Sequence, residues 1–356
     1  MGVFYYWKSY AKEEKQHNAV IGHNEHAVGQ LFSWEPEEKE RIALFPILHE
    51  DLWQYWSLIN GLHWTAQKVD LTHDKWDWMN KMDENERTFI RHQLVFFVRI
   101  DFDVLDNIDK NFREELNCME VQMFYTAQQH QECVHIESYS LQAQALLDGK
   151  ELEDVFLAIR RMPVVSLLRE WVMQWFNQRL LIGERLVAFG VVEGVLFSAS
   201  FASLQWLREK NLLPGITDFN SYIARDEGIH TLFTCMIIKR YFLSKSSRVR
   251  VKEIFDSAIK TVDAFVDESL PTGLSGIDSF SMKRYMRFQA DCVLNAMGYG
   301  PFYFAENPFP FMDKLSLNGH IKVNFFEKHN SSYQLLTHHG SGDFSLQQSD
   351  SDSDSD

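Results

Sequence analysis

The stretch HQECVHIESY, residues 130–139, places a glutamate, a histidine and a tyrosine at Glu132, His135 and Tyr139, inside a segment otherwise suited to burial. At roughly 100° per residue, these three side chains point within about a 60° arc of a helix and face the same neighbour. YIARDEGIH repeats the Glu-x-x-His spacing at Glu227 and His230 on a second apolar helix. Because a buried carboxylate costs several kcal/mol unless something compensates it, both pairs require a partner in the interior.

Two more carboxylates belong to the same kind of environment. Glu193 lies in AFGVVEGVLFSASF, where no lysine or arginine on the same face balances its charge. In LVFFVRIDFDVLDN the candidates are Asp101, Asp103 and Asp106, and spacing alone does not choose among them. A third Glu-x-x-His match lies in the polar stretch AKEEKQHN, residues 11–18, where both side chains can be hydrated, and we interpret it as accidental.

Two helices with Glu-x-x-His and two helices with one carboxylate each form the ligand set of ferritin-like dinuclear carboxylate proteins. Four carboxylates bring four negative charges, which two divalent cations cancel. This makes an otherwise costly cluster tolerable in a core. Ligation by oxygen and two imidazoles, without a thiolate, favours iron or manganese over a closed structural zinc site.

The composition limits the class of protein and its partners. With 45% apolar residues and 28 Phe in 356 residues, the chain has material for a large core. A formal charge of −15 argues against nucleic acid as a partner, since phosphate-backbone binding needs a basic face. The four cysteines are widely spaced and form no CxxC pair, which favours a reducing, cytoplasmic setting. Polar or charged residues interrupt every long apolar run, so we expect no membrane span.

The pattern along the chain predicts helices almost throughout. Asp83 followed by Glu86 is typical of a capping box at the start of a helix that runs through FIRHQLVFFVRIDFDVL. Further helices are expected at about 112–146, 151–178, 180–210, 217–245, 247–268 and 281–297. Pro163 should bend or break its helix, and LPG at 213–215 is typical of a helix-to-helix turn.

We therefore predict an all-α, ferritin-like helical bundle with the dinuclear metal site in its core. The predicted divisions are an N-terminal extension at residues 1–35, the helical domain at 36–318 and a flexible C-terminal tail at 319–356. The tail ends in alternating Ser and Asp residues, which cannot bury apolar surface.

With these features in view, the sequence resembles the small, radical-generating subunit of class I ribonucleotide reductase, closest to the eukaryotic type. The resemblance runs from roughly residue 40 to 345. The blocks that carry it are FPILHEDLWQYW, HWTAQKVDLTHD, DENERTFIRHQLVFF, ECVHIESYS, ERLVAFGVVEGVLFSASFASLQWL, LLPGITDFNSYIARDEGIH, ENPFPFM and NFFEK.

The resemblance implies a role for each matching position. The implied metal ligands are Asp101, Glu132 and His135 on one side, and Glu193, Glu227 and His230 on the other. Tyr139 matches the stable tyrosyl radical, and Phe197, Phe201 and Ile223 match the apolar pocket that shields it. Trp64, Asp226 and Tyr333 match the route by which the radical passes to a separate large subunit. The implied cofactor is a pair of iron ions, with manganese as the alternative, and the implied assembly is a homodimer.

The chain departs from the family pattern at its end and next to one ligand. Family members end in a short acidic-hydrophobic tail that docks on the large subunit, whereas this chain has DFSLQQ followed by Ser/Asp repeats, with Phe344 and Leu346 as the docking candidates. Ile136 follows His135 where the family often has serine. None of the implied ligands or the radical tyrosine is lost.

Two other functions would share part of this pattern. A related di-iron oxidase or ferroxidase would have the same ligands but no need for the exit route of Trp64, Asp226 and Tyr333. A non-catalytic paralogue that supports a partner subunit would be marked by lost ligands. The intact set favours the small subunit of ribonucleoside-diphosphate reductase, an oxidoreductase that makes deoxyribonucleotides.

Overall fold

The computed structural model describes residues 31–159, 162–177, 179–270 and 274–313. Within these ranges the regular elements are helices, and the single pairing of strand type is an isolated bridge between Phe32 and Phe242. The prediction of an all-α fold is confirmed. In chain order the elements are α2 (Glu35–Glu38), α3 (Glu50–Gly61), η1 (Ala66–Lys68), α4 (Thr72–Asn80), α5 (Glu84–Asn107), η2 (Ile108–Phe112), α6 (Arg113–Glu115), α7 (Met119–Leu146), α8 (Gly149–Ile159), α9 (Pro163–Trp175), α10 (Ile182–Val191), η3 (Val192–Leu196), α11 (Ser198–Glu209), α12 (Pro214–Met236), η4 (Ile237–Tyr241), α13 (Arg248–Ser269), α14 (Ser279–Met297) and η5 (Pro310–Met312).

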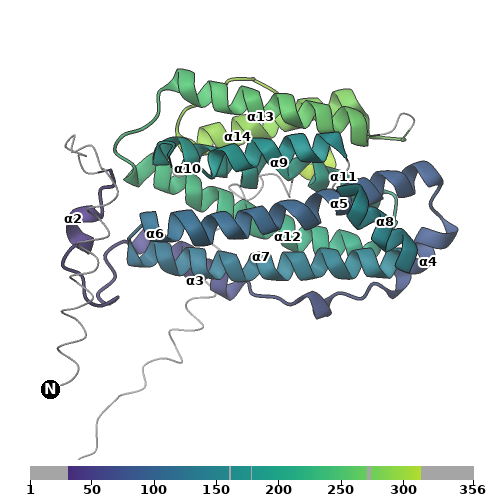
Figure 1. Cartoon of the computed structure of the whole chain (residues 1–356), viewed down its shortest axis with the longest axis horizontal. Coiled ribbons are helices and arrows are strands. Elements are labelled where there is room, and N and C mark those ends of the chain that lie inside the picture. The colour runs from purple at the N-terminus through teal and green to yellow at the C-terminus, as the bar shows by residue number, and fades with distance from the viewer. Residues whose placement is uncertain (1–30, 160–161, 178, 271–273, 314–356) are drawn as a thin grey trace, which may run out of the picture.

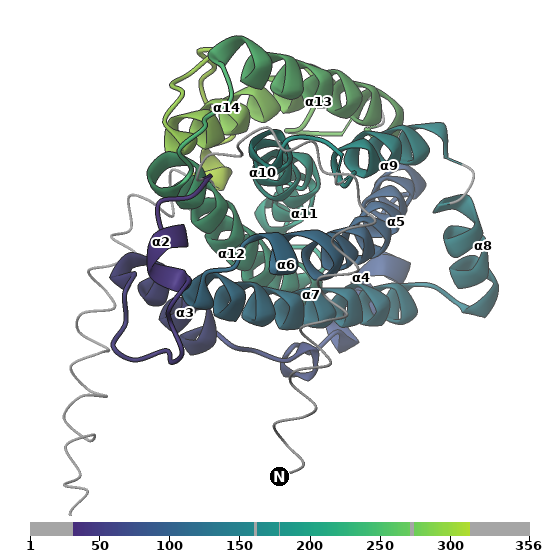
Figure 2. The same ribbon diagram turned by 60° about the vertical axis from the view of Figure 1, so that its left-hand side comes forward.

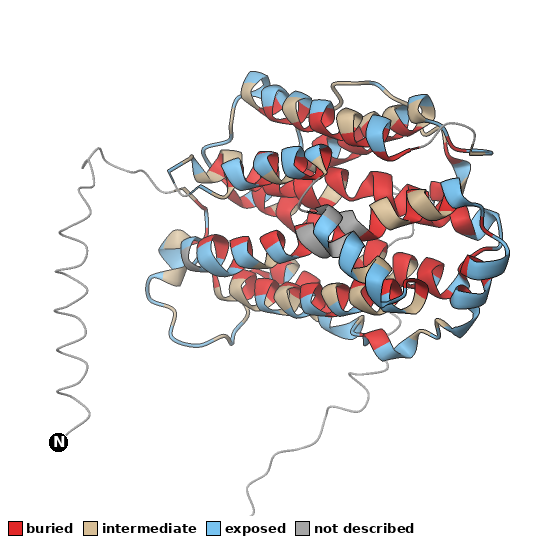
Figure 3. Cartoon of the chain, turned by 45° about the vertical axis from the view of Figure 1, so that its right-hand side comes forward, coloured by how far each residue is buried: buried red, intermediate tan, exposed pale blue. Residues whose placement is uncertain are grey.

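The long helices lie side by side in one bundle (Figure 1). Figure 2 shows α10 and α11 at the centre, with α12, α7, α5, α9, α13 and α14 arranged around them. The neighbours α5 and α7, α11 and α12, and α13 and α14 pack along one another. Buried residues follow the faces turned towards this centre (Figure 3), as expected for amphipathic helices around a single core.

The central segment Ile182–Glu209 is mostly apolar, and most of its residues are buried by the surrounding helices. Its length and a mean hydropathy of 1.8 over its most apolar window would suffice to cross a membrane, yet 94% of that window is buried inside the bundle. Such burial is typical of a helix in a protein core. Gly194 lets this segment approach its neighbours, since a Cβ there would come within 2.6 Å of Val293 and 2.7 Å of Thr231.

Local sequence signals account for several helix boundaries. Asp83 accepts a hydrogen bond from the backbone N–H of Glu86 while the Glu86 side chain accepts one from the Asp83 N–H, so the predicted capping box is present. Pro163 begins α9 after the break that follows α8. Leu213 takes a left-handed conformation, with φ of 49°, between α11 and α12. The break at Pro163 and the turn at 213–215 are therefore confirmed.

One predicted helix begins later than expected. The prediction of a helix from about 112 is wrong at its start, because α7 begins at Met119 after an extended Cys118. The preceding residues 108–112 form the π-helical turn η2. Residues 1–30 and the predicted start of the tail at residue 319 lie outside the described ranges. Phe32 and Trp34, which belong to the predicted N-terminal extension, are buried.

Candidate metal centre

Four helical segments bring the six predicted ligands together. Asp101 comes from α5, and Glu227 and His230 come from α12. The ligand-type atoms form two groups, and within each group they lie within 4.8 Å of one another. One group is Asp101, Glu132 and His135, and the other is Glu132, Glu193, Glu227 and His230. Every one of these side chains is buried. Glu132 belongs to both groups, so the two groups form one continuous centre.

Two glutamates connect the halves of the centre. Glu132 Oε2 lies 3.2 Å from His135 Nδ1, and Glu132 Oε1 lies 3.3 Å from His230 Nδ1. Glu227 also contacts both histidines. Its Oε1 lies 3.1 Å from His135 Nδ1, and its Oε2 lies 3.2 Å from His230 Nδ1. Each carboxylate can therefore hold two cations at once, one beside each histidine.

The remaining two carboxylates, Asp101 and Glu193, each belong to one half of the centre and have no hydrogen-bond partner within the protein. Both oxygens of Asp101 and both oxygens of Glu193 are buried and make no hydrogen bond. Burial and the neighbouring Glu132 and Glu227 charges raise the pKa of Asp101 well above its ordinary value. Burial and Glu227 likewise raise the pKa of Glu193. Unpaired buried carboxylates are costly, and a pair of divalent cations is the compensation that this donor set fits.

Glu193 lies on η3, a π-helical turn between α10 and α11. A π turn inserts one extra residue into the helical hydrogen-bond pattern and often marks a functional site. The turn presents Glu193 to α12, where its Oε2 lies 3.5 Å from His230 Nδ1.

The outer nitrogens of the two histidines meet different acceptors. His135 Nε2 lies 3.4 Å from Asp226 Oδ2, whereas His230 Nε2 lies 2.8 Å from the amide oxygen of Gln131. An acceptor at Nε2 fixes the proton there and leaves Nδ1 free to bind a metal. Sequence reasoning missed Gln131, although its place directly before Glu132 on an apolar helix was a signal.

The structure separates the three candidate aspartates of α5. Asp103 pairs with Arg169 across 3.0 Å, and Asp106 pairs with Lys110. Asp101 alone of the three lies in the centre.

A buried hydrogen-bonded chain leads away from His135. Trp64 Nε1 donates to Asp226 Oδ2 across 2.7 Å, the same oxygen that lies near His135 Nε2. Arg225 donates to the other oxygen of Asp226 at 2.8 and 3.0 Å. The predicted route residues Trp64 and Asp226 are thus in contact, while Tyr333 lies outside the described residues.

Tyr139 is buried beside the centre, at 1% exposure. Its ring stacks on Phe97 with centroids 4.5 Å apart and planes 8° apart. Phe97 in turn stacks on Phe197 and Phe201 at 6.0 and 5.3 Å, and Ile223 is also fully buried. Phe97 was not among the predicted pocket residues, although it lies four residues before Asp101 and therefore on the same face of α5.

A small cavity adjoins the centre. Its lining includes Glu193, Glu227 and Phe201, and its volume of about 20 Å³ is room for roughly one water-sized molecule.

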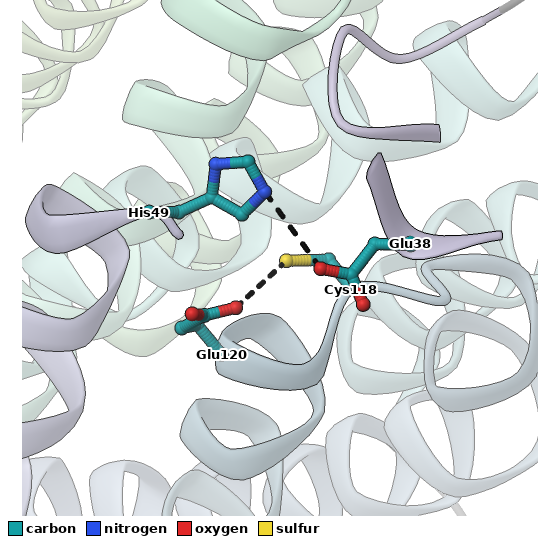
Figure 4. Close-up of side chains that lie close together, drawn as sticks. All are labelled: Glu38, His49, Cys118 and Glu120. Carbon is teal, nitrogen blue, oxygen red and sulfur yellow. Dashed lines mark hydrogen bonds and ion pairs between the residues drawn. The ribbon is translucent and has the colours of Figure 1, made fainter. Parts of the chain in front are cut away.

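A second cluster of ligand-type side chains, Glu38, His49, Cys118 and Glu120, lies near the start of α7 (Figure 4). In this cluster the guanidinium group of Arg41 already balances the negative charge of the carboxylates. Arg41 donates to Glu120 at 2.6 and 2.8 Å and to Glu38 at 2.7 Å. We interpret this cluster as an ion-pair clasp that holds residues 35–49 against α7.

Comparisons with known proteins indicate the family of the chain. The family model for the ribonucleotide reductase small chain matches residues 41–308. The chain is 39% identical to ribonucleoside-diphosphate reductase small chain 1 of Saccharomyces cerevisiae over 332 residues, or 91% of this chain and 82% of the relative. It is 40% identical to subunit M2 of Homo sapiens over 302 residues, or 84% of this chain and 77% of the relative.

Solved structures give the same result. The structure of the Rnr4 homodimer from Saccharomyces cerevisiae has a TM-score of 0.72 and 29% identity, and the match covers 83% of this chain and 90% of that one. The dimanganese(II)-NrdF from Streptococcus sanguinis has a TM-score of 0.66 at 17% identity over 78% of this chain and 99% of that one, which supports the fold alone.

A helical bundle with two carboxylate–histidine half-sites and two glutamates that contact both histidines is typical of a dinuclear carboxylate protein. Within that class, the chain belongs to the ribonucleotide reductase small-chain family. The predicted function, small subunit of ribonucleoside-diphosphate reductase, is confirmed by these matches. Family and cluster together support a dinuclear metal site.

Proposed function

We propose that this chain holds two iron ions and forms a tyrosyl radical on Tyr139, which a separate large subunit uses to reduce ribonucleoside diphosphates. When bound, a redox-active ion pair supplies the reaction with dioxygen. The observation that carries the proposal is the position of Tyr139, buried one helical turn beyond His135 and sealed by Phe97. The oxygen-rich donor set also fits manganese.

The six proposed ligands have distinct tasks. Glu132 and Glu227, which contact both histidines, would help to hold both ions, while Asp101 and Glu193 would each help to hold one. The hydrogen-bond acceptors Asp226 and Gln131 hold the two imidazoles with Nδ1 turned inward. The cavity beside Glu193 and Glu227 is the proposed position for a small molecule that approaches the ions.

The environment of Tyr139 suits a radical that is neutral. Burial and the nearby Asp101 charge raise the pKa of the Tyr139 phenol well above its ordinary value, so the phenol keeps its proton until an electron leaves. We propose that the proton then leaves toward the metal centre. Stacked Phe97, with Phe197, Phe201 and Ile223 around it, excludes water and reductants from the ring.

The radical would leave the core through the hydrogen-bonded side chains of His135, Asp226 and Trp64. It would then pass through Tyr333 to the large subunit. The C-terminal tail, with Phe344 and Leu346, is the proposed docking segment. We also propose a homodimer that works in the cytoplasm. The homodimer is supported by the relative named as the Rnr4 homodimer.

Electron paramagnetic resonance tests the proposal. Addition of ferrous iron and dioxygen to the metal-free chain should give a tyrosyl signal that Tyr139→Phe abolishes. Uptake of iron with no organic radical would instead favour a self-contained oxidase or ferroxidase. The third candidate, a non-catalytic supporting paralogue, would show neither iron uptake nor a tyrosyl signal. The intact ligand set argues against it.

A further inference from the structure

Trp64 is the last residue of the buried hydrogen-bonded series that runs from His135 through Asp226. It is only 4% exposed, and its indole N–H donates to Asp226 inside the protein. Another group must therefore connect Trp64 with the surface.

Tyr222 is the aromatic residue that covers Trp64 on its outer side. It lies on α12, one turn before Asp226, and its ring stacks on Trp64 with centroids 5.2 Å apart and planes 29° apart. Tyr222 is half-buried, so its side chain reaches solvent. Phe219 also contacts Trp64, at 6.0 Å, but it is fully buried and has no hydroxyl group.

Two cations hold the ring of Tyr222. Lys68 Nζ lies 5.5 Å from the ring centroid, and Arg225 Cζ lies 5.7 Å from it. Arg225 also forms the ion pair with Asp226, so one guanidinium contacts both the ring and the carboxylate. Cations over a ring disfavour positive charge on it. Loss of an electron from Tyr222 therefore requires loss of the phenol proton in the same event.

We propose that Tyr222 is a redox-active relay between Trp64 and the protein surface. An electron passes from Tyr222 to oxidised Trp64, which returns to its reduced form. The phenol O–H bond breaks, its proton goes to water at the exposed part of the side chain, and Tyr222 becomes a neutral phenoxyl radical. The oxidant of Trp64 is the radical centre described under the proposed function, on which this inference rests.

The alternative role for Tyr222 is a lid that only keeps water from Trp64. Tyr222→Phe separates the two roles because phenylalanine keeps the stacked ring and loses the O–H group. Deoxyribonucleotide formation by the complex with the large subunit, normalised to the Tyr139 radical content of each preparation, should fall at least tenfold in Tyr222→Phe. Unchanged normalised turnover would overturn the proposal.

A radical trap at the same position gives a direct readout. With Tyr222→3-aminotyrosine in the full complex with substrate, we expect an aminotyrosyl signal in electron paramagnetic resonance, with an equal loss of the Tyr139 signal. The matched control is Tyr303→3-aminotyrosine, since Tyr303 lies beside Lys252 and Asp256 rather than Trp64, and it should trap nothing. A normal Tyr139 radical with no signal from position 222 would overturn the relay alone. Absence of any Tyr139 radical in the unaltered chain would overturn the proposed function, and the relay with it.

Discussion

His230 and Gln131 form a 2.8 Å hydrogen bond from imidazole Nε2 to amide oxygen, whereas the other histidine of the centre faces the carboxylate of Asp226. The two metal positions are therefore unequal, because an anionic acceptor makes an imidazole a stronger donor to a metal than a neutral amide does.

Gln131→Leu removes the acceptor from His230 and should weaken metal binding at one of the two positions about 10-fold to 100-fold. Calorimetric titration of the metal-free protein with Mn²⁺ would resolve the two affinities. Gln131→Glu, which restores an acceptor, should recover binding at that position. Gln144→Leu, at an exposed position of the same helix, is the control, and equal affinities in Gln131→Leu and the unaltered chain would contradict the role of Gln131.

Phe97→Leu should shorten the life of the Tyr139 radical, because the aromatic ring that stacks on Tyr139 at 4.5 Å is lost. The decay of the tyrosyl signal after addition of a small water-soluble reductant measures this, and we expect it to be several-fold faster. Phe255→Leu alters a buried phenylalanine of α13 and serves as the control for general loosening of the core. Equal decay in the two variants would show that Phe97 gives Tyr139 no particular protection.

The chemistry of the centre was more predictable from sequence than its surroundings. Glu132, His135, Glu193, Glu227 and His230 could be chosen because buried charged groups on apolar helices are costly, whatever the packing. Spacing could not select Asp101, since the arginine that pairs with Asp103 is distant in sequence. Family resemblance made that choice, and the position of Asp101 in the centre agrees with it.

Other features depend on contacts between helices and left no clear local signal. The stack of Phe97 on Tyr139 joins α5 to α7, and the stack of Tyr222 on Trp64 joins α12 to the segment before α4. The π turn that carries Glu193 has the sequence VEGVL, which by itself does not distinguish a π turn from an α-helical one.

The ion-pair clasp at the start of α7 should make the free energy of unfolding depend on pH. Burial pushes the pKa of Glu120 upward, but hydrogen bonds and charge from Arg41 outweigh it and lower the pKa to about 2. A folded-state pKa below the unfolded value contributes stability above the unfolded pKa, and that stability is lost as the pH falls from about 4.5 towards 2. At neutral pH the contribution is about 3 kcal/mol.

Urea unfolding of metal-free Glu120→Gln and of the unaltered chain tests this dependence. The difference in unfolding free energy should be largest at pH 5 to 7 and should shrink by more than half by about pH 3. Glu153→Gln, at an exposed position of α8, should show no such trend. A difference that stays constant with pH would mean that the Arg41 pair does not control the ionisation of Glu120.

The number of metal ions bound per chain tests the central claim most directly. Anaerobic equilibrium dialysis of the metal-free full chain against Fe²⁺, followed by elemental analysis, should give two ions per chain. Glu132→Ala should bind far less than one ion, because it removes a carboxylate shared by both positions, while Asp101→Asn should weaken chiefly one. A chain that binds no iron, or a Glu132→Ala variant that still binds two ions, would contradict a centre built on bridging glutamates.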